Sequence, residues 1–354
     1  MSAKGRGNLH TPTRLTVREV GTELLEGMTA GVVLPRRRSR DGSPYKVSAI
    51  ESVRSSLTGH VYGPLGTSRL SDVSRVDVQA LVDKMTRDGL SGQTIRNAVN
   101  ALSLVYRFAR TRKDPGLVSP VGDLELPAAG RRERVVSTVE GQTLLAALPL
   151  DLRALYGLAV YGGLRRGEIA GLDWRHVDFA TNVVTVERAW CSRSLTMVEP
   201  KSAAGRRRVP VPSVLREILL DWAAKSGATG LMFPSARDTG RPFDPRAISR
   251  RADKAWAAAN AKELERAEAE GREPRLLTRV ILHEGRHSAA SSFIASGLDP
   301  VRVAGWLGHS QTSTTLDRYA HAFEAREQTD AGMLDAFHAL ALAEAADRGP
   351  VAGQ

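Results

Sequence analysis

The sequence predicts a mainly α-helical protein with a small antiparallel β-sheet (α+β), built as two domains. Apolar residues recur at helical spacing over most of the chain, whereas the alternation typical of strands is confined to residues 183–211. Prolines, glycines and a run of charged residues separate two periodic regions near residue 130. With 354 residues, the chain is long enough for two domains that each bury a core.

The first domain is expected at residues 14–125, after a disordered tail at 1–13. Within it, four segments place their apolar residues on one helical face: 15–28, 46–57, 75–88 and 91–109. Asp72 or Ser74 suits the N-cap of the third helix, and Ser91 opens the fourth. The outer face of the fourth helix is polar and basic.

Residues 126–136 are expected to be a linker, followed by a second domain at 137–346 and a tail at 347–354. In the second domain, strands are expected at 183–188, 195–199 and 206–211, and helices at 138–149, at 151–162 and from Pro212 onward. The last two strands flank a hairpin-like turn of small residues at 201–205. The Ala- and Glu-rich segment 252–270 is expected to be a solvent-facing helix.

The balance of charge favours a polyanionic partner. The chain has 50 lysines and arginines against 39 acidic residues, which gives a net charge of +11, and only eight of the basic residues are lysines. The planar fork of arginine suits bidentate contacts with phosphate. Basicity alone leaves two explanations open, a nucleic-acid-binding protein and a merely basic soluble protein.

Cysteine usage and hydropathy exclude several classes of protein. A single cysteine, Cys191, excludes an internal disulfide and any multi-cysteine metal site. No run reaches the roughly 18 apolar residues of a membrane span, and no apolar signal core follows the charged N-terminus. We therefore expect a cytoplasmic protein without a membrane partner.

Six residues of the second domain together supply what attack on a phosphodiester requires: Arg165, Lys201, His283, Arg286, His309 and Tyr319. The five basic residues offer positive charge and proton donors, and the tyrosine offers a nucleophile, so that no metal is needed. Taken singly, each has an ordinary structural explanation, such as a surface arginine, a solvated lysine, a histidine at a helix end or a core tyrosine. Their order and spacing in one chain favour the chemical explanation.

The motifs around these residues resemble those of the tyrosine recombinases, the phage integrase family. The similar stretches are G-L-R-x-x-E at 163–168, P-K-S-x-x-G at 200–205, H-x-x-R-H at 283–287, L-G-H-S at 307–310 and T-T-L-D-x-Y at 314–319. The resemblance covers roughly residues 15–325. One departure is Gly285, where the family usually has leucine; glycine weakens a helix by about 1 kcal/mol relative to alanine.

The resemblance implies a helical core-binding domain, a tyrosine-recombinase catalytic domain and the activity of a site-specific DNA recombinase or integrase. Tyr319 would hold cleaved DNA as a 3′-phosphotyrosine during integration or excision of a phage or mobile element. The other implied roles are phosphate clamping by Arg165 and Arg286, protonation of the leaving oxygen by Lys201, proton transfer at the tyrosine by His283, a hydrogen bond to phosphate from His309, and orientation of these groups by Glu168. No cofactor and no metal are implied.

The resemblance also implies macromolecular partners. These are double-stranded DNA attachment sites, a homotetramer assembled on paired sites and an accessory directionality factor. DNA contacts in the first domain are expected from Lys46, Arg96, Asn97, Asn100 and Arg107. An apolar stripe at 331–346 is expected to dock either in its own subunit or on a neighbouring one.

Three alternative functions can be weighed on the sequence, of which the first two stay open. A chromosome-dimer-type recombinase is one, although the arginine-rich composition and the ten-residue spacing from His309 to Tyr319 favour an integrase. A type IB topoisomerase shares the tyrosine chemistry but would relax supercoils without paired sites. A regulator that only holds DNA would lack a reactive residue, and none is missing.

Overall fold

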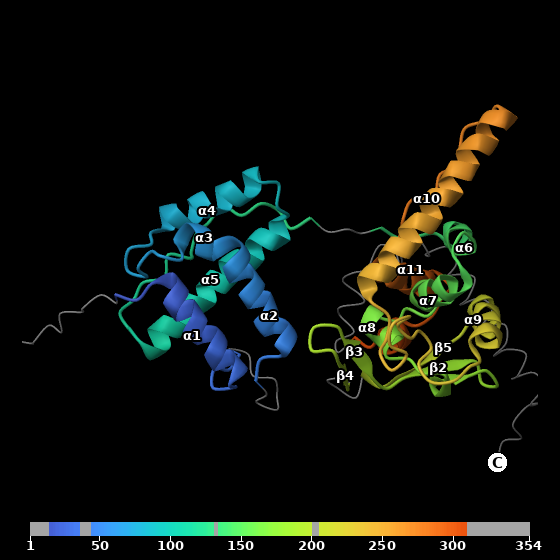
Figure 1. The fold of residues 1–354 in the computed structure, drawn as a ribbon, viewed down its shortest axis with the longest axis horizontal. Helices are drawn as coiled ribbons and strands as arrows, with labels where there is room; N and C mark the ends of the chain where they lie inside the picture. Colours follow the sequence, from blue (N-terminus) through green and yellow to red (C-terminus); the bar gives the residue numbers. More distant parts are fainter. Residues whose placement is uncertain (1–13, 36–43, 131–133, 200–204, 310–354) are drawn as a thin grey trace, which may run out of the picture. The chain divides into compact units, whose positions relative to one another are not determined.

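The computed structural model describes residues 14–35, 44–130, 134–199 and 205–309. The chain divides into two units, Met1–Arg131 and Arg132–Gln354, and most of their elements are labelled in Figure 1. The division falls inside the segment predicted as a linker, while the predicted limits of the domains and tails stay predictions. Lys201, Tyr319 and the apolar stripe at 331–346 lie outside the described residues.

Helices make up the first unit. They are α1 (Val17–Thr29), α2 (Val47–Ser56), a π-helical turn (Leu57–Val61), α3 (Tyr62–Leu65), α4 (Arg75–Arg87) and α5 (Gly92–Arg112). Capping boxes open α1 and α4, with Thr16 and Ser74 as the N-caps, and Ser91 caps α5. These side chains satisfy N–H groups that have no partner inside a helix. Ser74, rather than Asp72, is therefore the cap of α4.

The long helix α5 carries much of the core of this unit. Ile95, Leu102, Val105 and Tyr106 on one of its faces are fully buried. The Tyr106 hydroxyl donates to the Leu70 carbonyl at 3.0 Å, so its polar atom is satisfied. Burial of each large aliphatic side chain contributes about 1.5–3 kcal/mol. The opposite face of α5 is left to polar and basic residues.

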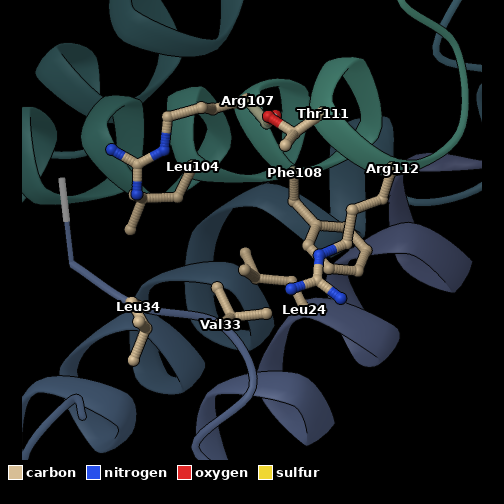
Figure 2. A pocket seen from close by; sticks show the side chains of 8 residues that line it. All are labelled: Leu24, Val33, Leu34, Leu104, Arg107, Phe108, Thr111 and Arg112. Carbon is tan, nitrogen blue, oxygen red and sulfur yellow. The ribbon is translucent and has the colours of Figure 1, made fainter.

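A small cavity of about 120 Å³ lies between α1, α5 and the segment that follows α1. Figure 2 shows Leu24 and Val33 beside Phe108 and Arg112 of α5. Arg112 donates to the Val32 carbonyl at 2.6 Å, and its guanidinium carbon lies 5.7 Å from the centre of the Phe108 ring. Ligand sites are typically larger, about 300–1,000 Å³. We assign this cavity a packing role, in which Arg112 fixes the segment to α5.

The second unit combines helices with short strands. Its helices are α6 (Thr138–Ala146), α7 (Leu150–Val160), α8 (Arg166–Ala170), a 3₁₀ turn (Trp174–His176), α9 (Ser213–Ser226), α10 (Pro245–Glu270), α11 (Leu282–Ala295) and α12 (Pro300–Leu307). Its strands are β1 (Val177–Asp178), β2 (Val183–Val186), β3 (Ala189–Cys191), β4 (Thr196–Val198) and β5 (Arg207–Pro210). The predicted α+β fold is confirmed.

Antiparallel ladders form two small sheets in this unit. β2 lies between β1 and β5, with Val184 opposite Val209, and β3 pairs with β4. β4 and β5, which flank the predicted hairpin-like turn, therefore pair with different strands. The sequence analysis predicts neither β1 nor β3. β1 has only two residues, and the three residues of β3 (Ala-Trp-Cys) are all apolar and show no alternation.

The core of the second unit surrounds α7, which lies against α9 and α11. From α10, Trp256 reaches this core, and its Nε1 donates to the Leu144 carbonyl at 2.9 Å. The predicted solvent-facing helix 252–270 forms most of α10, whose end projects away from the rest of the unit (Figure 1). Within the described ranges, no helix is both long and apolar enough to cross a bilayer.

Candidate active site

The turn from α7 to α8 places the first candidate arginine. Gly163 has a left-handed backbone (φ +67°), which glycine adopts without strain, and the chain then enters α8 with Arg165 as its N-cap. The Arg165 N–H donates to Glu168 Oε2 at 2.8 Å, so this carboxylate caps the helix. The Arg165 side chain is 42% exposed and is accessible to a ligand.

Glu168 is a buried carboxylate held by two guanidinium groups. Its Oε1 accepts from Arg165 Nη1 at 2.8 Å and from Arg207 Nη1 at 2.9 Å, and its Oε2 accepts from Arg207 Nη2 at 2.7 Å. Burial alone would raise the pKa of Glu168, but the hydrogen bonds and charge of Arg207, followed by those of Arg165, lower the pKa to about 2. Glu168 is therefore ionised at neutral pH.

Arg286 reaches the same place from α11. It is 4% exposed, and its Nη1 donates to the Gly163 carbonyl at 2.6 Å. Its Nη2 donates to the carbonyl of Leu307 at the end of α12. Because Gly163 lies two residues before Arg165, these bonds join the segments that carry both arginines.

The C-terminal end of α12 holds three arginines on three consecutive carbonyl groups. The pairs are Trp306 O with Arg207 Nε, Leu307 O with Arg286 Nη2, and Gly308 O with Arg165 Nη2 at 2.9 Å. The last carbonyls of a helix lack partners within it and carry the negative end of its dipole. They hold guanidinium groups in place without the full neutralising charge of a carboxylate.

Three histidines lie on or directly after the two helices that take part in the arginine contacts: His283 and His287 on α11, and His309 after α12. His309 directly follows Gly308, whose left-handed backbone (φ +62°) ends α12. His283 is exposed in the first turn of α11, three residues before Arg286, a spacing that puts both on one helix face. His283 Nε2 lies 3.1 Å from Nε2 of His287, one turn further along. The two rings are thus hydrogen-bonded neighbours.

Arg165, Arg207, Arg286 and Glu168 form what we call the arginine cluster. Its three positive charges exceed its one negative charge, so two positive charges remain for an anion. A phosphate group has the charge and the acceptor oxygens to meet this excess. Among the described residues, no group of three or more histidine, cysteine or acidic side chains is arranged to hold a metal ion.

The structure brings together some of the predicted site residues. Arg165, Glu168 and Arg286 belong to one hydrogen-bonded cluster, and His309 follows the helix end that holds it. His283 shares a helix with Arg286. Lys201 and Tyr319 lie outside the described residues, so the chemical roles of all six stay predictions.

The five residues predicted to contact DNA lie in the first unit. Lys46 is the exposed N-cap of α2, and Asn97 and Asn100 are exposed on α5. Arg96 and Arg107 are half-buried, and each donates a hydrogen bond within the unit. The four α5 residues share the polar face of that helix.

Comparison with known proteins identifies the family. The model of the phage integrase family matches residues 133–326, more than half of the chain. The chain belongs to the phage integrase family. It is accordingly a tyrosine-type site-specific DNA recombinase.

Two of the similar relatives are the ICEBs1 integrase of Bacillus subtilis and the tyrosine recombinase XerC of Xylella fastidiosa. The first is 24% identical over 282 residues, which cover 75% of this chain and 72% of that protein. The second is 28% identical over 251 residues, which cover 69% and 75%. A putative prophage phiRv2 integrase of Mycobacterium tuberculosis is 29% identical over 200 residues, 55% of this chain and about half (49%) of the relative.

Solved integrase structures share the fold. The Tn1549 transposon integrase, in complex with transposon right end DNA, has a TM-score of 0.60 at 18% identity and covers 91% of this chain and 100% of that one. A lambda integrase (75–356) dimer bound to a COC′ core site has a TM-score of 0.59 at 16% identity and covers 86% and 95%. At these identities, the likeness establishes the fold.

Arg207 and His287 are members of the site region that the sequence analysis does not assign. Arg207 lies in a basic run on a strand, where an arginine is usually a surface charge. The available signal is its alternation with Val209 and Val211, because residues two apart point to the same face of a strand. His287 is quoted in the H-x-x-R-H motif, and its signal is the four-residue spacing from His283.

Gly285, at the position where leucine is usual in the phage integrase family, lies where α11 meets α7. A Cβ atom built on it would lie 3.0 Å from Val160 Cγ2 and 3.3 Å from Ala159 Cβ. The missing side chain therefore allows a close approach of the two helices. Glycine at this position thus fits the side chains that α7 presents to it, Val160 and Ala159.

Replacing Gly285 by leucine is expected to destabilise the protein, because the added side chain overpacks the contact with Val160. The free energy of unfolding should fall by about 1–3 kcal/mol, and Val160→Ala in the same chain should recover part of it. Denaturant titration measures both. Gly305→Leu is the matched control, since a Cβ there meets nothing within 4 Å. Equal effects at the two glycines would contradict the packing explanation.

Acid should destabilise the protein through Glu168. The ordinary pKa of this carboxyl is 4.5 and the folded state lowers it to about 2, so the unfolded chain binds more protons between these values. Its stabilisation is complete above about pH 4.5 and is lost as pH falls toward about 2, which amounts to about 3 kcal/mol. Unfolding free energies of the wild type and Glu168→Gln over this range should differ in slope. Parallel pH profiles would contradict the assignment.

Proposed function

We propose that this chain cuts and rejoins DNA through Tyr319, as the integrase of a mobile element. The observation that carries the proposal is the arginine cluster at the end of α12, in a chain of the phage integrase family. The tyrosine oxygen attacks the scissile phosphorus, a P–O bond to the tyrosine forms, and the bond to the 5′-oxygen breaks. The resulting 3′-phosphotyrosine keeps the ester for rejoining, so no nucleotide is consumed.

Arg165 and Arg286 bind the non-bridging oxygens of that phosphate. Each guanidinium has five N–H donors in a fixed plane, and the hydrogen bonds described above engage only some of those of Arg165. The exposed part of Arg165 offers the remaining donors to an incoming oxygen. Negative charge grows on these oxygens in the transition state, where the positive excess of the arginine cluster stabilises it most.

The remaining three residues handle protons and the phosphate. His283, exposed on the face of α11 that carries Arg286, takes the proton of the Tyr319 hydroxyl. Lys201 protonates the 5′-oxygen as it leaves. His309, held next to the α12 end by Gly308, donates a hydrogen bond to a phosphate oxygen. The roles balance, because one proton is removed at the nucleophile and one is added at the leaving group.

The first unit contributes DNA binding through the polar face of α5. Asn97 and Asn100 are exposed there, and Arg96 and Arg107 are held by hydrogen bonds that fix their direction. Lys46 adds a charge at the start of α2. Ordered arginines and exposed amides are the groups that contact phosphates and base edges.

Integration or excision of a mobile element is the function we favour, by analogy with the ICEBs1, phiRv2 and Tn1549 integrases. A chromosome-dimer-type recombinase is the second candidate, and the similarity to XerC favours it. Four protomers would act on two attachment sites, as lambda integrase forms a tetramer on a Holliday junction. An accessory factor would set direction, and the reaction would take place in the cytoplasm of a bacterial host.

A nicked suicide substrate tests the chemistry. On a DNA that loses its 5′-hydroxyl fragment after cleavage, the wild-type protein should form an SDS-resistant adduct in EDTA and without nucleotide, because side chains supply the charge stabilisation. The protein should be attached to the 3′ end of the DNA. An adduct that appears only after magnesium is added, or that is attached to a 5′ end, would contradict the proposal.

A further inference from the structure

We propose that Arg207 is a positioning residue of the recombination site, and this inference rests on the function proposed above. Arg207 does not reach substrate itself. It fixes Glu168 and the end of α12, and these two groups hold Arg165 in place. Loss of Arg207 should therefore slow cleavage through a misplaced Arg165, with little change in DNA affinity.

Burial and strand register place Arg207 inside the unit. It is 9% exposed, and it stands opposite Val186 in the ladder of β2 and β5. Its chain neighbours are both exposed: Arg206 directly before β5, and Arg208 on it. Because successive side chains along an extended chain point to opposite faces, Arg207 points inward while the arginines on either side of it point outward. A buried guanidinium is retained in a fold when its donors find acceptors, and those of Arg207 do.

The shared carboxylate is the first link from Arg207 to Arg165. Both oxygens of Glu168 accept from Arg207, at 2.9 and 2.7 Å, and the same two oxygens accept the Arg165 side chain and N–H, each at 2.8 Å. Arg207 therefore fixes the plane of the carboxylate against which Arg165 is aligned. It also offsets the charge of Glu168, so that the carboxylate does not cancel the charge of Arg165.

The end of α12 is the second link. Arg207 Nε donates to the Trp306 carbonyl, two residues before the Gly308 carbonyl that accepts from Arg165 at 2.9 Å. The carbonyl between them, of Leu307, accepts from Arg286. Arg207 thus holds the helix end whose Gly308 carbonyl accepts from Arg165.

The test measures single-turnover adduct formation on the suicide substrate, DNA affinity and thermal unfolding for one set of variants. Arg207→Met should lower the adduct rate by about 100-fold, the loss that a small misplacement of a catalytic group causes. Arg208→Met, the same change at the exposed neighbour, is the control and should keep the wild-type rate. DNA affinity should stay within about threefold in both.

Arg207→Met also leaves Glu168 buried without its main partner, which can unfold the protein. The double variant Glu168→Gln/Arg207→Met removes both charges and should recover thermal stability, while its adduct rate stays at least about tenfold below wild type. Recovery of both stability and rate would show a purely structural role and overturn the proposal.

A double-mutant cycle supplies the readout that a structural role would not give. In an Arg165→Lys background, the fork that Arg207 aligns is absent, so adding Arg207→Met should cost less than about threefold. If the fold-losses of the two single variants multiply in the double variant, Arg207 acts independently of Arg165, and this result would overturn the proposal. An adduct at wild-type rate from Arg207→Met would contradict the role of Arg207 alone. A wild-type protein that forms no adduct would contradict the proposed function and, with it, this role.

Discussion

Replacing Tyr319 by phenylalanine is expected to abolish the covalent protein–DNA adduct while DNA binding is kept. The substitution removes one oxygen atom, the proposed nucleophile, and phenylalanine offers no other atom that can form a bond to phosphorus. The adduct should fall below detection on the nicked suicide substrate, in a gel run in SDS. In a native gel, the variant should shift the DNA at the same protein concentration as the wild type does.

A second tyrosine provides the matched control for Tyr319→Phe. The Tyr161 hydroxyl is buried and makes no hydrogen bond within the described part of the chain. Tyr161→Phe therefore removes the same atom at a site without a proposed reaction, and adduct formation should be unchanged. A full-strength adduct from Tyr319→Phe would remove Tyr319 from the mechanism, whatever the control shows.

Replacing Arg286 by alanine should produce the second largest loss. One phosphate donor contributes about 2.7–4 kcal/mol to the transition state, so the cleavage rate should fall by about 10²–10³-fold. The buried carbonyls of Gly163 and Leu307 would also lose a donor, which costs about 1–3 kcal/mol of folding stability for each group left unsatisfied. Single-turnover cleavage and thermal unfolding measure the two effects separately.

Arg302→Ala is the control for Arg286→Ala, because Arg302 is exposed on α12. It should change neither the cleavage rate nor the stability. Arg286→Lys should remain slow, since a lysine presents its donors from one nitrogen atom and cannot span the two carbonyls that separate guanidinium nitrogens of Arg286 hold. Wild-type cleavage by Arg286→Lys would mean that charge alone matters at this position and that the hydrogen-bonded placement does not.

The helices of this protein can be predicted from its sequence because their signals are local. Apolar spacing predicts a helix at 15–28, and the structure has α1 at Val17–Thr29; it predicts one at 75–88, and α4 is Arg75–Arg87. In both helices, the N-cap side chain is hydrogen-bonded to the residue three positions later, and this pair fixes where the helix starts. Strand pairing depends on residues far apart in the chain, which is why the partners of β4 and β5 do not follow from the turn between them.

The site is predictable only in part, for a physical reason. Arg165 and Arg286 can be found because motif order and spacing single them out, and the structure does join them through α12. Arg207 is hidden between two exposed arginines, Arg206 and Arg208. The carbonyls of 306–308 cannot be found at all, since every residue has a carbonyl and only the fold decides which ones end a helix.

The acceptors at the end of α12 have a consequence for how the protein tolerates mutation. A side-chain substitution does not remove a carbonyl oxygen, so the identity of Trp306 carries little information about its part in holding Arg207. Changes to chain geometry are different. An insertion in the helix, a proline, or a side chain at Gly308 (φ +62°) would shift all three oxygens together. Natural variation should therefore preserve the length and the terminal glycine of this helix more strictly than its exposed side chains.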